Sequence, residues 1–100
     1  MLYALFAEDV PNSEKLRQAA RSAHLIRLRH LQDEGRLVLA GPMLAIDAPD
    51  PGPAGFNGTL IVAEFPSLAE AEAWFAAEPF VTEGVFARTW VRPFKQTFPQ

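Results

Sequence analysis

The chain has 100 residues, of which 49% are hydrophobic, and this is enough for one core and a single domain over residues 1–100. Its 9 basic and 12 acidic residues give a formal net charge of −3, a balance that excludes general nucleic-acid binding. Cysteine is absent, which excludes disulfides, thiolate catalysis and cysteine-ligated zinc. No apolar run approaches the ~20 residues of a membrane span. The N-terminal segment has no basic leader, so we expect a cytoplasmic protein that does not bind membranes.

Turn signals divide the chain into six predicted elements. In chain order these are a strand, a helix, two strands, a second helix and a last strand, over residues 2–7, 12–35, 36–40, 59–65, 67–78 and 85–94. The alternating pattern of the last segment is typical of a strand whose two faces are covered differently. Between the second and third strands, residues 47–58 are rich in Pro, Gly and Asp and predict a long polar loop.

Local signals predict where the helices begin and end. Asn12 or Ser13 can cap the first helix, and Gly35 ends it in the left-handed position after the last turn. The second helix begins with a capping box, Ser67–Glu70. It stops before Pro79, because the residue that precedes a proline is pushed out of helical geometry.

The order βαββαβ is the ferredoxin-like pattern, in which both helices pack on one face of a four-stranded antiparallel sheet. Each predicted strand carries apolar residues on both sides, so the second face of the sheet also needs a cover. A second copy of the chain is the simplest cover. We therefore expect an α+β protein that forms a homodimer through its sheet faces.

The first helix places a histidine on its apolar stripe. That stripe consists of Ala20, His24, Leu28 and Leu31. A ring that titrates near neutral pH costs free energy when it is buried, unless a partner satisfies it. Two interpretations stay open at this point. His24 is either a general acid or base in a site, or a core histidine that is hydrogen-bonded for packing alone.

Two arginines share the helix surface with His24, namely Arg17 and Arg21. Arg21 either binds a small carboxylate or oxyanion beside His24, or forms a salt bridge with Asp9 or Glu8 in the turn before the helix. Asp9 is open to two interpretations as well. It is either the acidic partner of His24 or an ordinary loop acid.

The sequence predicts neither a metal nor a cofactor site. His30 follows His24 by six residues and lies roughly 240° around the helix, and no third ligand is evident, so we expect His30 at the surface. No Gly-rich phosphate loop is present. Gly41 and Pro42 close the second predicted strand. They either let a ligand approach the backbone or simply form the turn that the strand end requires.

Short motifs along the whole chain resemble the YciI-like (YCII-related) family. They are Met1-Leu2-Tyr3, Phe6-Ala7-Glu8-Asp9, Arg21-x-x-His24-Leu25, Asp33-Glu34-Gly35-Arg36-Leu37, Ala40-Gly41-Pro42-Met43, Ala54-Gly55-Phe56-Asn57-Gly58, Ala63-Glu64-Phe65, Gly84-Val85 and Pro93-Phe94-Lys95. The resemblance implies a dimeric α+β barrel made of two sheets face to face. It also implies a cleft in which a histidine and an acidic residue have been proposed as a catalytic pair. Where the family commonly has Asp-Pro-Tyr after the second helix, this chain has Glu78-Pro79-Phe80.

The leading hypothesis is a homodimer with a cleft for a small polar or anionic organic molecule. His24 would act as acid or base in a cofactor-independent proton transfer, hydrolysis or elimination, and Arg21 would orient an anionic group. Glu78 or Asp9 would set the tautomer of the histidine ring. The alternative is a non-catalytic dimeric module that binds a ligand or a partner protein, with His24 in a structural role.

Overall fold

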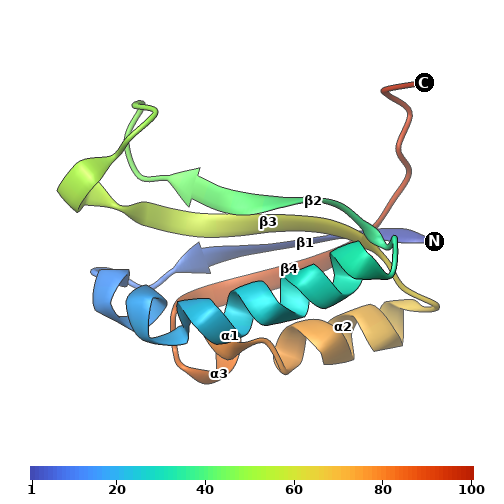
Figure 1. The fold of residues 1–100 in the computed structure, drawn as a ribbon, viewed down its shortest axis with the longest axis horizontal. Helices are drawn as coiled ribbons and strands as arrows, with labels where there is room; N and C mark the ends of the chain where they lie inside the picture. The colour runs from blue at the N-terminus through green and yellow to red at the C-terminus, as the bar shows by residue number, and fades with distance from the viewer.

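The computed structural model describes residues 1–100 as one sheet with a layer of helices on one of its faces (Figure 1). The elements are β1 (Leu2–Asp9), α1 (Glu14–Asp33), β2 (Leu37–Leu44), the 3-10 turn η1 (Gly52–Ala54), β3 (Phe56–Glu64), α2 (Leu68–Ala76), α3 (Pro79–Thr82) and β4 (Phe86–Phe94). The four strands are antiparallel in the order β2-β3-β1-β4, so β2 and β4 are the edges. The predicted ferredoxin-like α+β fold is confirmed.

The C-terminal end of α1 follows the local signal in the sequence, whereas the expected side-chain cap at its N-terminal end does not form. Gly35 has a φ of +72°, and its amide donates to the carbonyl of Gln32 at 2.9 Å. The amide of Arg36 donates to the carbonyl of Leu31 at 2.9 Å, which completes a Schellman ending. Ser13 is the N-cap residue, but its hydroxyl donates to Asp9 instead of accepting from the helix amides.

The second strand is longer than predicted. Gly41 and Pro42 were expected to close it, yet β2 continues to Leu44 and pairs with β3 along its length. A proline is tolerated here because β2 is an edge strand, and an edge strand has backbone amides that need no partner in the sheet. The third strand starts earlier than expected, at Phe56, so the loop between the two strands is residues 45–55.

The segment after α2 forms a short helix that the sequence reasoning missed. Ser67 accepts a hydrogen bond from the amide of Glu70 at 3.1 Å, as the predicted cap requires. α2 then ends at Ala76, and the chain re-enters helical geometry at Pro79, the first residue of α3. Glu78, with an extended backbone, is the N-cap of α3. The proline that ends one helix therefore begins the next.

The core lies between the sheet and the helices. Leu5 and Ile61 face it from the central strands, and both have no exposed surface. The predicted stripe of α1 faces the core, because Ala20, His24 and Leu31 are buried and Leu28 is half-buried against it. Phe75 on α2 closes the same core. None of the helices combines the length and apolarity that crossing a membrane requires.

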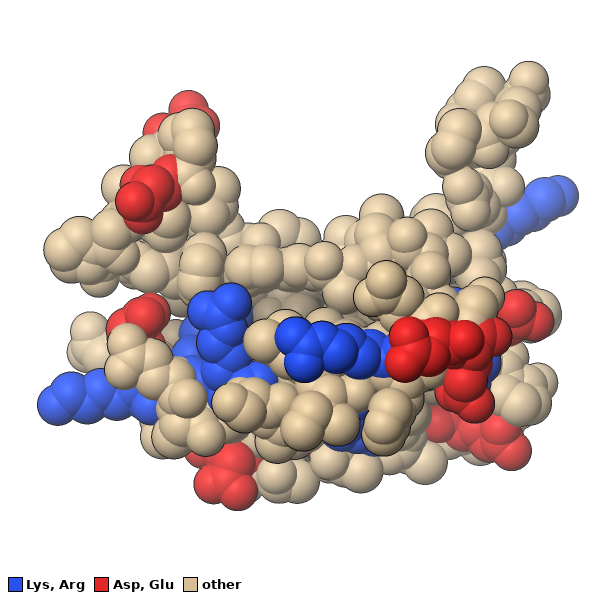
Figure 2. All heavy atoms as spheres, viewed as in Figure 1, with Lys and Arg blue, Asp and Glu red and all other residues tan.

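No helix covers the other face of the sheet, which we call the open sheet face. By strand register its apolar residues include Leu2, Ala4, Phe6, Leu60, Val62, Trp90 and Phe94. The rings of Phe6 and Trp90 stack on this face with their centres 5.0 Å apart. The loop after β2 and the C-terminal tail both project beyond this face, one at each end of the sheet (Figures 1 and 2). The open sheet face therefore lies between two projections.

Candidate active site

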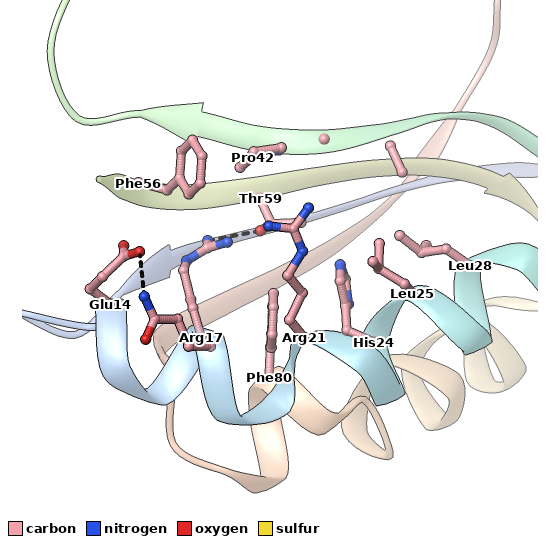
Figure 3. A pocket seen from close by; sticks show the side chains of 13 residues that line it. Glu14, Arg17, Arg21, His24, Leu25, Leu28, Pro42, Phe56, Thr59 and Phe80 are labelled. Atoms are coloured by element: carbon pink, nitrogen blue, oxygen red, sulfur yellow. Dashed lines mark hydrogen bonds between the residues drawn. The ribbon is translucent and has the colours of Figure 1, made fainter. Parts of the chain in front are cut away.

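A cavity of about 220 Å³ separates α1 from the edge of the sheet (Figure 3). α1 forms one wall, and Gly41 and Pro42 of β2 form part of the opposite wall. Phe56 and Thr59 of β3 and Phe80 of α3 also line the cavity. Lys and Arg side chains gather between the helix layer and the sheet on this side of the molecule (Figure 2). The cavity is therefore partly apolar and has cationic side chains at its entrance.

His24 lines this cavity and is hydrogen-bonded to Glu78 through Nδ1 and Oε1. The two side chains are 9% and 0% exposed. An ionised carboxylate can only accept, so a hydrogen bond to ionised Glu78 requires the ring hydrogen on Nδ1. The other nitrogen, Nε2, has no hydrogen-bond partner in the protein. Every side-chain nitrogen or oxygen that is buried has such a partner, so Nε2 is not a buried atom. Nε2 is therefore accessible from the cavity side.

The turn between α2 and α3 aims the Glu78 carboxylate at His24. Oε1 accepts from the amide of Phe80 at 3.4 Å as well as from the histidine, and Oε2 accepts from Nη1 of Arg27 at 3.1 Å. The Phe80 ring stacks on the imidazole with ring centres 4.1 Å apart and an interplanar angle of 14°. His24 is thus held at its ring face by Phe80 and at Nδ1 by Glu78.

Asp9 is not the partner of His24, and the structure corrects that alternative. Its carboxylate accepts from Nε of Arg17 at 2.6 Å, from Nη2 of Arg17 at 2.9 Å and from the hydroxyl of Ser13 at 2.6 Å. Arg17 lies almost two turns closer than His24 to the turn between β1 and α1, so it reaches Asp9 first. Asp9 is therefore part of a buried structural ion pair.

Arg17 is a buried cation whose role the sequence reasoning missed. Beyond Asp9, its Nη2 donates to the carbonyl of Gly58 at 2.8 Å. It also donates to the hydroxyl of Thr59 at 3.0 Å (Figure 3). The signal was its position, three residues before Ala20 on the apolar stripe. A charged residue on that stripe predicts a buried counter-ion. Arg17 fastens α1 to the sheet at one end of the cavity.

Arg21 has no ion pair and no hydrogen bond within the protein. The alternative that Arg21 forms a salt bridge with Asp9 or Glu8 is wrong, because Asp9 pairs with Arg17 and Glu8 pairs with Arg88. Arg21 is exposed, lines the cavity and extends over it from α1 (Figure 3). Its guanidinium group is therefore free to receive an anion.

The structure places the remaining candidates as follows. His30 is exposed in the last turn of α1, as expected. No group of three or more His, Asp or Glu side chains is arranged to hold a metal ion. Arg27, which the sequence reasoning did not single out, contacts Glu78 from outside the cavity. Its signal was the spacing of three residues from His24, which places the two side chains on adjacent turns.

Comparison with known proteins establishes the relationship that this geometry suggests. Residues 1–95 match the YCII-related domain. The chain belongs to the YCII-related family. It is 51% identical over 98 residues to Protein YciI of Escherichia coli O6:H1, an alignment that covers 98% of this chain and 100% of that protein. It is 47% identical over 98 residues, with the same coverage, to an uncharacterized protein of Haemophilus influenzae.

One solved structure of an enzyme has the same fold. It is 5-chloro-2-hydroxyhydroquinone dehydrochlorinase (TftG) from Burkholderia phenoliruptrix AC1100, in complex with 2,5-dihydroxybenzoquinone. The TM-score is 0.84 and the sequence identity is 27%, over 95% of this chain and 94% of that chain. The predicted family is therefore confirmed, and so is the α+β fold.

Proposed function

We propose that this YCII-related protein is a cofactor-independent enzyme in which His24 moves a proton at Nε2. One observation carries the proposal. Nδ1 of His24 is committed to the buried Glu78, and Nε2 is left accessible beside the cavity. A carboxylate on Nδ1 holds the imidazole in the tautomer that accepts a proton at Nε2, and it stabilises the imidazolium that forms.

The lining of the cavity favours a small, flat, anionic organic substrate. A volume of about 220 Å³ is below the range typical of drug-sized ligands. Arg21 offers an unpartnered cation, whereas Leu25, Leu28 and Phe56 offer apolar surface. A hydroxylated ring with one ionised oxygen fits both features. TftG supports this substrate class, since it is described as a dehydrochlorinase in complex with 2,5-dihydroxybenzoquinone.

An elimination or another proton transfer is the reaction that this site suits. In a loss of HCl the base takes a proton from a C–H or O–H bond of the substrate, and the electrons of that bond go into a new π bond of the substrate. Chloride leaves with the electron pair of its bond to carbon. The step is balanced without an oxidant or a reductant. Nε2 of His24 would take the proton, and Arg21 would hold the anionic oxygen of the substrate.

The assembly that we propose is a homodimer through the open sheet face. This face carries apolar side chains, including the stacked Phe6 and Trp90, and no element of the chain covers them. Its position between two projections suits a second copy of the same shape (Figure 2). The cavity lies on the helix side of the sheet, so a dimer of this kind leaves the cavity open.

The test uses 2,5-dihydroxybenzoquinone for binding and 5-chloro-2-hydroxyhydroquinone for chloride release. His24→Asn is expected to keep the fold and to abolish chloride release, and Glu78→Gln is expected to reduce release strongly. His30→Asn, at the other histidine of the chain, serves as the matched control and should behave as the wild type.

Three results would contradict parts of the proposal. If the wild type neither binds the quinone nor releases chloride, the substrate class is wrong. If His24→Asn loses stability but keeps binding and turnover, His24 is structural. If the wild type binds the quinone without turnover in any variant, the protein is a ligand-binding module.

A further inference from the structure

Arg27 reaches the carboxylate of Glu78 from outside the cavity. It lies one turn after His24 on α1, and its Nη1 donates to Oε2 at 3.1 Å while Oε1 faces the imidazole. Its guanidinium carbon lies 4.2 Å from the centre of the Trp74 ring on α2. The Arg27 side chain is 24% exposed, whereas that of Glu78 is 0% exposed. The aromatic ring therefore fixes the cation beside a carboxylate that has no exposed surface.

Arg27 is the cation that neutralises the negative charge of the Glu78 carboxylate. A wholly buried carboxylate is costly unless a cation neutralises it. Arg17, the buried arginine of α1, is already paired with Asp9. His24 is uncharged when it acts as a base, so it cannot neutralise Glu78. Arg27 is therefore the cation that matches the charge of Glu78.

The charge of Glu78 decides which nitrogen of His24 carries the hydrogen. As a carboxylate, Glu78 can only accept, so the hydrogen sits on Nδ1 and Nε2 presents its lone pair to the cavity. As a neutral carboxylic acid, Glu78 would donate to Nδ1. The ring hydrogen would then sit on Nε2, which could no longer take a proton.

We propose that Arg27, fixed by Trp74, is a positioning residue that selects the base-competent tautomer of His24. The catalytic meaning of this role rests on the proposed function. The tautomer itself can be measured in the free protein, so the two proposals can fail separately. Arg27 does not line the cavity, so it acts on the substrate only through Glu78 and His24.

The experiment is a long-range ¹⁵N–¹H NMR correlation of the histidine rings, which distinguishes a protonated ring nitrogen from a bare one. In the wild type we expect His24 with hydrogen on Nδ1 and a bare Nε2. In Arg27→Met we expect the Nε2–H form to gain population, and the Nδ1 hydrogen to exchange with water roughly tenfold faster or more. Arg27→Lys keeps the charge but not the planar group, so it should restore the wild-type tautomer in part.

Arg36→Met is the matched control. Arg36 also lies over an aromatic ring, that of Phe65 at 5.1 Å, and also forms an ion pair, with Glu34 at 3.0 Å. Its removal costs the same kinds of contact but touches neither His24 nor Glu78. The His24 signals should therefore be unchanged in this variant.

The positioning role is overturned if folded Arg27→Met keeps the wild-type tautomer and exchange rate, or if Arg36→Met changes them equally. Should Arg27→Met not fold, Arg27→Gln, which also removes the charge, and Trp74→Leu decide, and a wild-type tautomer in both overturns the proposal. With a turned-over substrate, Arg27→Met should lower kcat and leave KM nearly unchanged. If His24→Asn retains turnover, the proposed function fails while the tautomer result still stands.

Discussion

Nδ1 of His24 is hydrogen-bonded to a carboxylate, that of Glu78, which has no exposed surface and stands 54 positions further along the chain. The two residues belong to different helical segments, because His24 lies in the middle of α1 and Glu78 is the N-cap of α3. The pair forms only when α1 packs against the turn between α2 and α3. Assembly of the site therefore depends on the packing of the helix layer.

Glu78→Ala is expected to destabilise the protein by about 3–5 kcal/mol, because it leaves Arg27, Nδ1 of His24 and the Phe80 amide without their acceptor. Urea unfolding followed by circular dichroism measures the change. Glu34→Ala is the control, since Glu34 is 58% exposed in its ion pair and its loss should cost less than about 1 kcal/mol. Equal losses in the two variants would show that the buried contacts of Glu78 stabilise the fold no more than an exposed ion pair does.

Neutralising two neighbouring acids of β1 is expected to cost very different amounts of stability. Asp9→Asn disrupts a pair whose side chains are 9% and 2% exposed, so it should cost about 3–5 kcal/mol. Glu8→Gln disrupts a pair whose side chains are 67% and 54% exposed, so it should cost about 1 kcal/mol or less. Thermal and urea unfolding of both variants check this. A stable Asp9→Asn protein would argue against the structural role of Arg17.

Gly58→Ala is expected to destabilise the sheet by about 1–3 kcal/mol, because the added Cβ would lie 2.6 Å from the carbonyl oxygen of Ala7 on β1. Gly41→Ala is the comparison, since nothing lies within 4 Å of a Cβ added there. It should leave stability unchanged and reduce the size of the cavity that Gly41 lines. Unfolding curves test the first effect, and quinone affinity tests the second.

Arg21→Met is expected to leave stability within about 0.5 kcal/mol of the wild type, because Arg21 has no partner to lose. Its affinity for 2,5-dihydroxybenzoquinone should fall roughly tenfold, the usual loss for one charge-assisted hydrogen bond. Lys15→Met removes one exposed cation from the same helix but outside the cavity, and isothermal titration should show no change for it. Equal affinity in the wild type and Arg21→Met would remove Arg21 from the binding site.

Trp90→Asp is expected to convert a dimer into a monomer, because it places a charge on the open sheet face beside Phe6. Light scattering of the wild type should give twice the chain mass. Ile26→Asp alters an apolar residue on α1 that is 50% exposed, and this variant should stay dimeric. A monomeric wild type at micromolar concentration would contradict the homodimer.

Much of this fold follows from local sequence signals. Gly35 ends α1 as its position predicts, Ser67 caps α2, and the stripe that carries His24 is buried. Each of these features depends on a residue and on neighbours within about one turn, so the interactions that produce it are encoded in the local sequence. The length of β2 was predicted less well, because the pairing with β3 extends the strand past Gly41 and Pro42.

The sequence by itself determined that a titratable ring would be buried on α1 and would need a partner, because helical spacing fixes which residues share a face. Only the tertiary structure decided which acid meets which cation. Asp9 forms an ion pair with Arg17, whereas Glu78 contacts His24 and Arg27. A buried charge is stabilised by whichever opposite group the folded chain brings within about 3 Å, and that distance is set by how α1, the sheet and the turn before α3 pack together.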